Sequence, residues 1–254
     1  MNGAPVGSEP CALFLDFDGT LVDIAERPDA VATEPGLAEA LAILRDRLGG
    51  ALAIVSGRPI AFLDRHLGEG AFDAAGLHGL ERRLGGAFQG CRPEDHPALR
   101  AGVAELQALF ADDSRIVIED KGCSVAVHWR LAPERLSDAR GAAGALAERL
   151  GGGYRIQYGK AVAEILPAGA GKGRVIASFL DEAPYRGRRP VFVGDDLTDE
   201  HGFEAVNARG GVSVRIGPGD TVAAVRLPSP ADLRGRLRAW AADGPNPFFR
   251  SDAD

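Results

Sequence analysis

The chain of 254 residues contains few cysteines, and they follow no metal-binding pattern. Cys11, Cys91 and Cys123 are the only three, and no two have the spacing of a zinc or thioredoxin-like motif. We therefore expect all three to be reduced, which favours a cytoplasmic protein.

Long apolar runs are also absent. No stretch approaches the roughly 18 consecutive apolar residues of a membrane helix, and residues 1–10 lack the basic region and apolar core of an export signal. The formal net charge of -7 argues against a general nucleic-acid or anionic-membrane binder. We predict a cytoplasmic protein with no nucleic-acid or membrane partner. The sequence leaves the oligomeric state open, with a monomer favoured.

Lysine is scarce as well, because arginine supplies nearly every cation. Only Lys121, Lys160 and Lys172 occur. An ammonium group is compact and rotatable, whereas a guanidinium is a planar fork. Each lysine is therefore a candidate for a site that needs a compact ammonium group. The alternative is that these three lysines were retained by chance.

The first apolar run ends in a dense group of polar residues. Residues 12–15 are too short and too uniformly apolar for an amphipathic helix, so we predict a strand buried on both faces. Asp16 and Asp18 follow at the carboxyl edge, where open α/β sheets bind ligands, and Thr20 adds a hydroxyl. Two carboxylates this close repel unless a cation or a shared proton intervenes. The pattern indicates a metal; an ordinary polar turn is the alternative.

A second apolar run, residues 51–55, ends in the same way. Ser56 and Gly57 follow it, and their hydroxyl and backbone donors can hold a phosphate oxygen. The helix that begins at Pro59 would add its dipole. The tripeptide Ser56-Gly57-Arg58 is weak evidence for a phosphate site by itself and gains weight only from its position after a strand.

A third run, residues 190–193, leads to Asp195, with Asp196 and Asp199 close behind. Magnesium prefers such oxygen ligands and keeps water and phosphate as the others. Lys172 begins the preceding predicted helix, where its ammonium can neutralise both a phosphoryl group and the first-motif carboxylate.

Residues 86–167 have a different order of predicted elements: a helix, two strands, a second helix and two more strands. This pattern indicates a small α+β domain inserted into a parallel-sheet domain. We predict an α/β fold with a Rossmann-like core of residues 1–85 and 168–254 and an insert of residues 86–167. The predicted helices are residues 36–48, 97–111, 133–150, 174–180 and 231–240. The predicted strands are residues 12–15, 51–55, 115–119, 124–130, 154–158, 161–166, 190–193 and 212–216.

Charged residues gather on the predicted strands of the insert. Lys160 and Glu164 would share a strand face about 13 Å apart, a span that suits a disaccharide. Glu119, Lys121 and Arg130 around the predicted hairpin can complete a polar surface for sugar hydroxyls. A solvated charged face is the alternative.

Four separated motifs occur in the order of a known superfamily. The chain resembles the haloacid dehalogenase (HAD) phosphatases in four motifs. They are DFDGTL at 16–21, SGR at 56–58, GKG at 171–173 and GDDLTDE at 194–200. More narrowly, four longer segments resemble the trehalose-6-phosphate phosphatases. They are GLHGLE at 76–81, VIEDKGCSVAVHWR at 117–130, AEILPAGAGKG at 163–173 and VGDDLTDEHGFEAVN at 193–207.

The resemblance implies a HAD core with a large α/β cap, and hydrolysis of trehalose 6-phosphate through an aspartyl-phosphate. Asp16 would be the nucleophile. Asp18, kept protonated by its neighbours, would be the general acid and then the base. Mg2+ would be held by Asp16, the Asp18 backbone carbonyl and Asp195.

The resemblance also implies roles for the remaining residues. Those that hold phosphoryl oxygens would be Thr20, Ser56, Gly57 and Lys172. Those that orient metal-bound waters or Lys172 would be Asp196 and Asp199. Those that bind the sugar would be Glu119, Lys121, Arg130, Lys160, Glu164 and His78. For His78 a structural hydrogen-bonding role is the alternative, and Arg58 receives no role.

Two other functions stay open at this point. One is a capped phosphatase for another sugar phosphate, such as that of sucrose or mannosylglycerate, which would use the same chemistry. The other is a non-catalytic sugar-phosphate sensor, since receiver domains also combine clustered aspartates, a hydroxyl and a lysine. Asp18 and the sugar-sized insert argue against the sensor.

Overall fold

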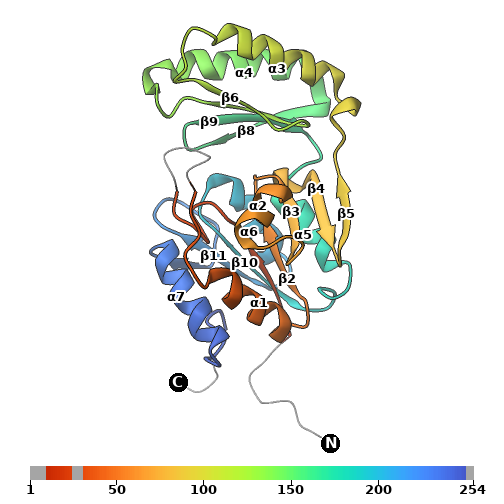
Figure 1. Cartoon of the computed structure of the whole chain (residues 1–254), viewed down its shortest axis with the longest axis vertical. Helices are drawn as coiled ribbons and strands as arrows, with labels where there is room; N and C mark the ends of the chain where they lie inside the picture. The colour runs from red at the N-terminus through yellow and green to blue at the C-terminus, as the bar shows by residue number, and fades with distance from the viewer. Residues whose placement is uncertain (1–9, 25–30, 250–254) are drawn as a thin grey trace, which may run out of the picture. The chain divides into compact units, whose positions relative to one another are not determined.

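The computed structural model describes residues 10–24 and 31–249. Two compact units are present, and each is described by itself (Figure 1). The larger unit comprises the chain up to Phe88, Gly171–Asp195 and the chain from Asp199 onward. The smaller unit comprises Gln89–Ala170 with residues 196–198.

The larger unit is built on one eight-stranded sheet. Its strands run in the order β12 (Val225–Leu227), β11 (Val212–Ile216), β10 (Arg189–Gly194), β1 (Cys11–Leu15), β2 (Leu52–Val55), β3 (Asp73–Gly76), β4 (Glu81–Leu84) and β5 (Ala87–Gly90). Neighbours from β12 to β3 are parallel, and β4 pairs antiparallel with β3. Such a parallel sheet needs cover on both faces, which agrees with the complete burial of β1.

Helices provide that cover. They are α1 (Leu37–Arg47), α2 (Ile60–Leu67), α5 (Lys172–Leu180), α6 (Glu200–Asn207) and α7 (Pro230–Ala241). Helix α1 packs against α7, and α5 packs against α6. In the core, the Phe14 ring stacks on Tyr185 and contacts Phe179.

The register of the sheet positions the polar loops. Strand β1 lies between β10 and β2, with Leu13 opposite both Val191 and Leu52. The three strands are parallel, so the loops that follow them leave at one edge. These loops carry the first, second and last motifs.

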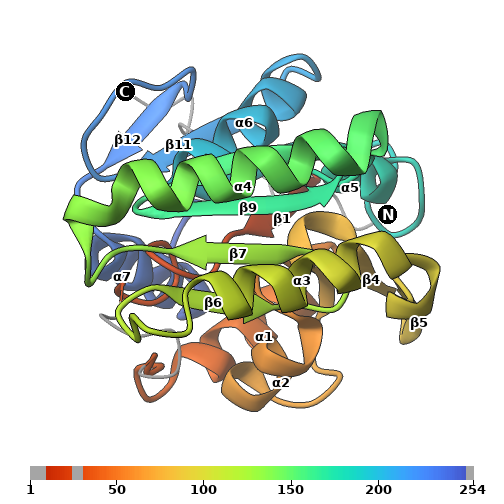
Figure 2. The same ribbon diagram turned by 90° about the horizontal axis from the view of Figure 1, so that it is seen from above.

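The smaller unit is an antiparallel sheet with helices on one face (Figures 1 and 2). Its strands run in the order β6 (Val117–Asp120), β7 (Val125–His128), β9 (Val162–Pro167) and β8 (Tyr154–Gly159). The helices are α3 (Pro97–Leu109) and α4 (Leu136–Leu150). Val125, Val127 and Ile165 point into the core beneath the helices, as the alternation along residues 124–130 predicts.

The predicted α/β class with a separate second sheet is confirmed. The sequence analysis missed β3, β4, β5, β12 and α6, which are short or rich in small or charged residues. The compact units divide near residues 89 and 170, whereas the sequence interpretation placed the insert at 86–167. Among the described residues, no helix is both long and apolar enough to cross a membrane.

Two expectations about the smaller unit are wrong. Lys160 does not lie on a strand: it lies in the turn between β8 and β9, where Ala161 has a left-handed φ of 59°. Cys91 and Cys123 are not reduced but form a disulfide, because folding brings two positions 32 residues apart together. Cys11 is the buried free cysteine.

Candidate active site

A buried lysine joins two of the motifs. Lys172, the first residue of α5, donates to Asp16 Oδ1 at 2.7 Å and to Asp199 Oδ1 at 2.5 Å. All three side chains are at most 5% exposed. Asp199 Oδ2 accepts from the Asp195 backbone N–H at 3.0 Å. Folding thus brings the first, third and fourth motifs to one point.

The loop after β1 leaves room for the carboxylates. Thr20 Oγ1 donates to Asp16 Oδ2 at 3.2 Å. Gly19 has a φ of 76°, and a Cβ there would lie 2.4 Å from Asp195 Oδ2. Only glycine allows this turn and this close approach of the two motifs.

The cluster contains more negative than positive charge. One ligand oxygen each from Asp16, Asp195 and Asp199 lies within 4.8 Å of the others. Burial and the other two carboxylates raise the pKa of Asp16 well above its usual value, although Lys172 opposes the shift. Burial would lower the pKa of Lys172, but Asp16 and Asp199 raise it overall. Both directions mean that the cluster attracts further positive charge, and its oxygen donors fit a hard divalent cation.

The second motif lies beside His78. Ser56 is buried, and its Oγ accepts from the Arg58 backbone N–H at 3.1 Å. A Cβ on Gly57 would lie 2.7 Å from His78 Nε2. The His78 backbone donates to Ser56 O and accepts from Gly171 N. His78 therefore ties the second motif to the loop that precedes Lys172.

His78 also adopts an uncommon backbone conformation. Its φ of 56° and ψ of 30° are left-handed, which costs a non-glycine residue about 1–2 kcal/mol. The sequence interpretation named His78 as a substrate contact that lies in the core of residues 1–85. The structure also has it in the larger unit, and its substrate role stays a prediction.

Asp18 has a cationic partner. Arg58 donates from Nε and one Nη to the two carboxylate oxygens of Asp18, both at 2.8 Å. The guanidinium also lies 4.3 Å from the centre of the Phe62 ring. Both oxygens of the Asp18 carboxylate thus have a partner that the sequence did not predict. The role of Asp18 as acid and base stays a prediction.

A polar row crosses the sheet of the smaller unit. Glu119 on β6 and Glu164 on β9 are both opposite Ala126 on β7, so they share a face. Lys121, in the turn after β6, donates to Glu164 Oε2 at 3.1 Å and lies 3.9 Å from Glu119 Oε2. Ser124 donates to Glu164 Oε1 at 2.7 Å. We call these four residues with His128 the polar row.

His128 completes the row. Its Nε2 lies 2.8 Å from Glu119 Oε2. Burial would raise the pKa of Glu119, but the hydrogen bond with His128 and the charge of Lys121 lower it overall. The members of the row are thus paired with one another.

The other predicted residues of this group lie elsewhere. Arg130 and Lys160 are exposed in turns next to one another, where the Trp129 N–H donates to Ala161 O. These turns lie at one end of β7, and the turn that carries Lys121 lies at its other end. Asp196 is half-buried in the short segment that groups with the smaller unit.

Sequence reasoning missed the polar partners of three predicted residues. They are Arg58 for Asp18, His128 for Glu119 and Ser124 for Glu164. Ser124 and His128 had one available signal, because both fall on the polar positions of the alternating run at 124–130. Arg58 had only its place in the second motif.

Comparison with known proteins decides the family. Residues 14–230 match the family model described as trehalose-phosphatase. The chain belongs to the trehalose-phosphatase family. It is therefore an enzyme of the phosphomonoester hydrolase class, and the resemblance drawn from the motifs is confirmed.

Curated relatives cover nearly the whole length of the chain. A protein of Sinorhizobium fredii named a probable trehalose-phosphate phosphatase is 45% identical over 234 residues, which cover 91% of this chain and 87% of the relative. The trehalose-6-phosphate phosphatase of Escherichia coli is 40% identical, with 92% and 87% covered. The C-terminal domain of the C. albicans trehalose-6-phosphate phosphatase shares the fold, with a TM-score of 0.81, 21% identity and 93% of each chain covered.

Proposed function

We propose that this member of the family hydrolyses trehalose 6-phosphate to trehalose and inorganic phosphate, with Mg2+ and through an aspartyl-phosphate on Asp16. The observation that carries the proposal is the buried contact of Lys172 with Asp16 and Asp199 beside Asp195. The names of the two relatives at 40% and 45% identity support the substrate.

Asp16 is the proposed nucleophile. Hydrogen bonds from Lys172 and Thr20 hold its two oxygens at fixed orientations, which lowers the entropy cost of in-line attack. One of these oxygens forms a bond to phosphorus while the bond from phosphorus to the sugar oxygen breaks.

Asp18 is the proposed acid and base. It gives a proton to the departing sugar oxygen and later takes one from the water that attacks the aspartyl-phosphate. Both carboxylate oxygens of Asp18 accept hydrogen bonds from Arg58, which holds the carboxylate in one orientation.

Asp16, Asp195 and the Asp18 backbone carbonyl would hold Mg2+, whose charge would offset repulsion between carboxylate and phosphate. Asp199 holds Lys172 and the backbone at Asp195. Asp196 is proposed to orient water. Phosphoryl oxygens are proposed to bind Thr20, Ser56, Gly57 and Lys172.

The polar row is the proposed binding surface for sugar hydroxyls, through Glu119, Lys121 and Glu164. Its carboxylates accept hydrogen bonds and its ammonium donates them, so it complements neutral hydroxyls. Arg130 and Lys160 at the other end of the sheet, and His78 in the larger unit, stay proposed substrate contacts. The sequence-based expectations of a cytoplasmic monomer also stay predictions, tested by cell fractionation and light scattering.

The test is phosphate release with Mg2+ from trehalose 6-phosphate, sucrose 6-phosphate, glucose 6-phosphate and mannosylglycerate phosphate. We expect a strong preference for the first. Asp16→Asn should lower the rate by at least about 10⁴-fold, because the nucleophile is lost. Asp220→Asn, an exposed aspartate of the same unit, is the matched control.

The outcomes separate the parts of the proposal. Release from a different sugar phosphate would keep the mechanism and reject the substrate. An Asp16→Asn enzyme with ordinary turnover would reject the nucleophile. Release from none of the four would favour the sugar-phosphate sensor.

A further inference from the structure

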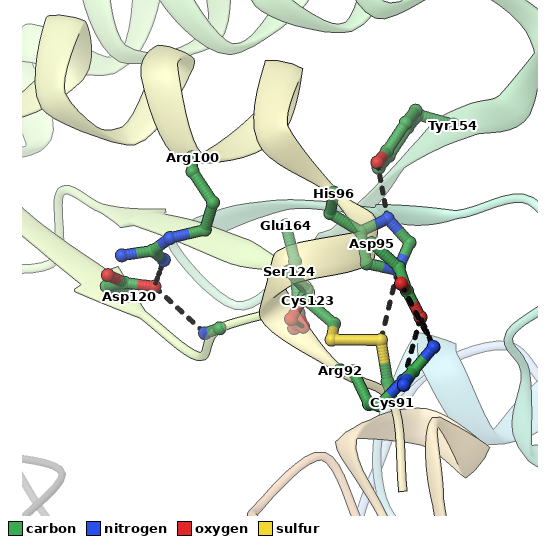
Figure 3. The surroundings of a disulfide bond; sticks show 11 residues. Cys91, Arg92, Asp95, His96, Arg100, Asp120, Cys123, Ser124, Tyr154 and Glu164 are labelled. Atoms are coloured by element: carbon green, nitrogen blue, oxygen red, sulfur yellow. Dashed lines mark hydrogen bonds and ion pairs between the residues drawn. A yellow bond between two sulfur atoms is a disulfide. The ribbon is translucent and has the colours of Figure 1, made fainter.

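The smaller unit contains a second group of reactive side chains. Cys91 and Cys123 form a disulfide, and His96 Nε2 lies 3.0 Å from Cys91 Sγ (Figure 3). His96 Nδ1 lies 2.6 Å from the Tyr154 hydroxyl oxygen, which fixes the orientation of the imidazole ring. The proposed hydrolysis uses none of these four side chains.

The environment of this pair favours thiol chemistry. A neighbouring imidazole stabilises a thiolate, the form of cysteine that attacks disulfides. Cys91 is half-buried, whereas Cys123 is almost fully buried, so Cys91 is the accessible sulfur. Cys11 is the contrast within the same chain. It is buried in the larger unit, and burial raises the pKa of its thiol to about 11.

The disulfide also holds the turn that positions part of the polar row. Cys123 lies between Lys121 and Ser124, which both bond to Glu164. Its backbone N–H donates to Lys121 O at 3.0 Å. The disulfide links this turn covalently to the segment that contains Cys91.

The other contacts that support the turn are noncovalent. Arg100 on α3 forms an ion pair with Asp120, and Asp120 accepts from the Gly122 backbone N–H at 2.8 Å (Figure 3). Pro93 lies close enough that a Cβ on Gly122 would be 3.0 Å from its Cγ. Loss of the disulfide would leave the turn with noncovalent contacts alone, which are this ion pair, the Pro93 contact, and hydrogen bonds within the turn and to Glu164.

We propose that Cys91 and Cys123 are a reversible thiol–disulfide exchange site for small-molecule disulfides and dithiols, and that the oxidised form holds Lys121 and Ser124 on Glu164. The effect on substrate affinity rests on the proposed function of the polar row. The exchange itself does not.

The exchange is a balanced two-electron step. The Cys91 thiolate attacks a small disulfide such as oxidised glutathione, forms a mixed disulfide and releases one thiolate. The Cys123 thiol then loses its proton, attacks Cys91 Sγ and releases the second thiolate. Two protein thiols are oxidised, one small disulfide is reduced to two thiols, and a dithiol reverses the process.

The first experiment counts thiols in the intact protein by alkylation in denaturant and mass spectrometry. We expect one thiol, from Cys11, after incubation with oxidised glutathione, and three after native incubation with dithiothreitol. His96→Asn should slow re-oxidation about tenfold, and Tyr154→Phe should slow it less. Three thiols under oxidised glutathione, or one after dithiothreitol, would overturn the exchange site.

The second experiment separates affinity from chemistry. With whichever sugar phosphate the panel identifies, reduction should raise KM about five- to tenfold and leave kcat nearly unchanged. Hydrolysis of p-nitrophenyl phosphate, which has no sugar, should not respond. The double variant Cys91→Ser with Cys123→Ser should have the KM of the reduced enzyme and ignore the redox state. Cys11→Ala should respond like the unmodified chain.

These results distinguish the two proposals. An equal KM in the oxidised and reduced chains would overturn the effect on affinity, even if the thiol counts change. If no sugar phosphate is hydrolysed, the proposed function fails, while the thiol count still decides the exchange site. Since reduced unmodified protein is measured beside the double variant, poor folding of that variant leaves the test intact.

Discussion

Each unit places a lysine between two carboxylates. In the larger unit Lys172 lies between Asp16 and Asp199. In the smaller unit Lys121 lies between Glu119 and Glu164. The residue types match, but the elements that carry them differ. The first group comes from loops and a helix start at the edge of a parallel sheet, and the second spans one face of an antiparallel sheet.

The difference lies in what else satisfies the carboxylates. His128 and Ser124 lie within hydrogen-bond distance of Glu119 and Glu164, so both carboxylates of the polar row have hydrogen-bond partners besides Lys121. Asp195, in contrast, adds a third carboxylate to the cluster around Lys172. A cluster with more carboxylates than cations attracts a cation and keeps a nucleophilic oxygen. A row whose carboxylates share several hydrogen bonds is better suited to hydroxyl groups.

The strongest way to break the comparison is to remove the first lysine. Lys172→Met should lower kcat roughly 10³-fold, because a preorganised cation is lost beside the nucleophile. It should also destabilise the fold by about 3–5 kcal/mol, since buried carboxylates lose their partner. Steady-state kinetics and urea unfolding measure the two effects. Arg174→Met, an exposed cation on the same helix, is the control, and equal loss in both variants would contradict the special role of Lys172.

Cation binding should divide the two groups next. At about 100 times its dissociation constant, Mg2+ should stabilise the chain by about 2.7 kcal/mol, which raises Tm by about 5–10 °C. Asp195→Asn should remove most of this shift in a thermal unfolding assay, because the cluster loses a ligand. Glu164→Gln is the matched carboxylate change in the polar row and should retain it. A shift lost in Glu164→Gln and kept in Asp195→Asn would reverse the assignment.

Removing the second lysine should give a smaller and different effect. Lys121→Met should raise KM for the sugar phosphate about tenfold, equivalent to about 1.4 kcal/mol. Hydrolysis of p-nitrophenyl phosphate should change less than about twofold, since the phosphoryl-transfer residues are intact. Arg149→Met, an exposed ion-paired residue of the same unit, is the control. Equal losses on both substrates would show that Lys121 acts through folding.

The smallest effect should come from an ion pair outside both groups. Asp113 bonds to Arg115 and Arg135, and the Arg115 guanidinium is the main cause that lowers the pKa of Asp113 to about 2. Because this folded-state value lies below the unfolded value near 3.9, the pair stabilises the fold above about pH 4. That contribution is lost as pH falls toward 2.

Asp113→Asn should therefore lower Tm slightly at pH 7, and the difference from the unmodified chain should shrink below pH 4. Thermal unfolding between pH 3 and pH 7 measures this, with the neighbouring Asp112→Asn as control. A difference that grows on acidification would contradict the ion-pair explanation.

Much of the larger unit was predictable because short apolar runs and the polar loops after them are local patterns. Residues 12–15, 51–55 and 190–193 all form strands of one sheet. The misplaced Lys160 has a local cause too. The apolar pattern of residues 161–166 extends into Ala161, but the left-handed φ of Ala161 places it in a turn.

The contacts that refine the proposed chemistry were not predictable. Arg58 bonds to Asp18, which lies 40 residues away in the chain. The sequence contains many arginines, and nothing in it indicates which one pairs with that carboxylate. Cys91 and Cys123 have no recognisable spacing. Their bond depends on how the segment before α3 packs against the turn between β6 and β7.

The α/β class, the inserted second sheet, the family and the candidate residues of the four motifs could all be predicted from the amino-acid order. These depend on residue order, periodicity and composition within short stretches. Which charged groups meet depends instead on how the chain folds. Lys172 reaches Asp16 from 156 residues away because the register of a parallel sheet brings separate loops to one edge. Pairings of this kind are set by packing over long distances in the chain, which no local pattern records.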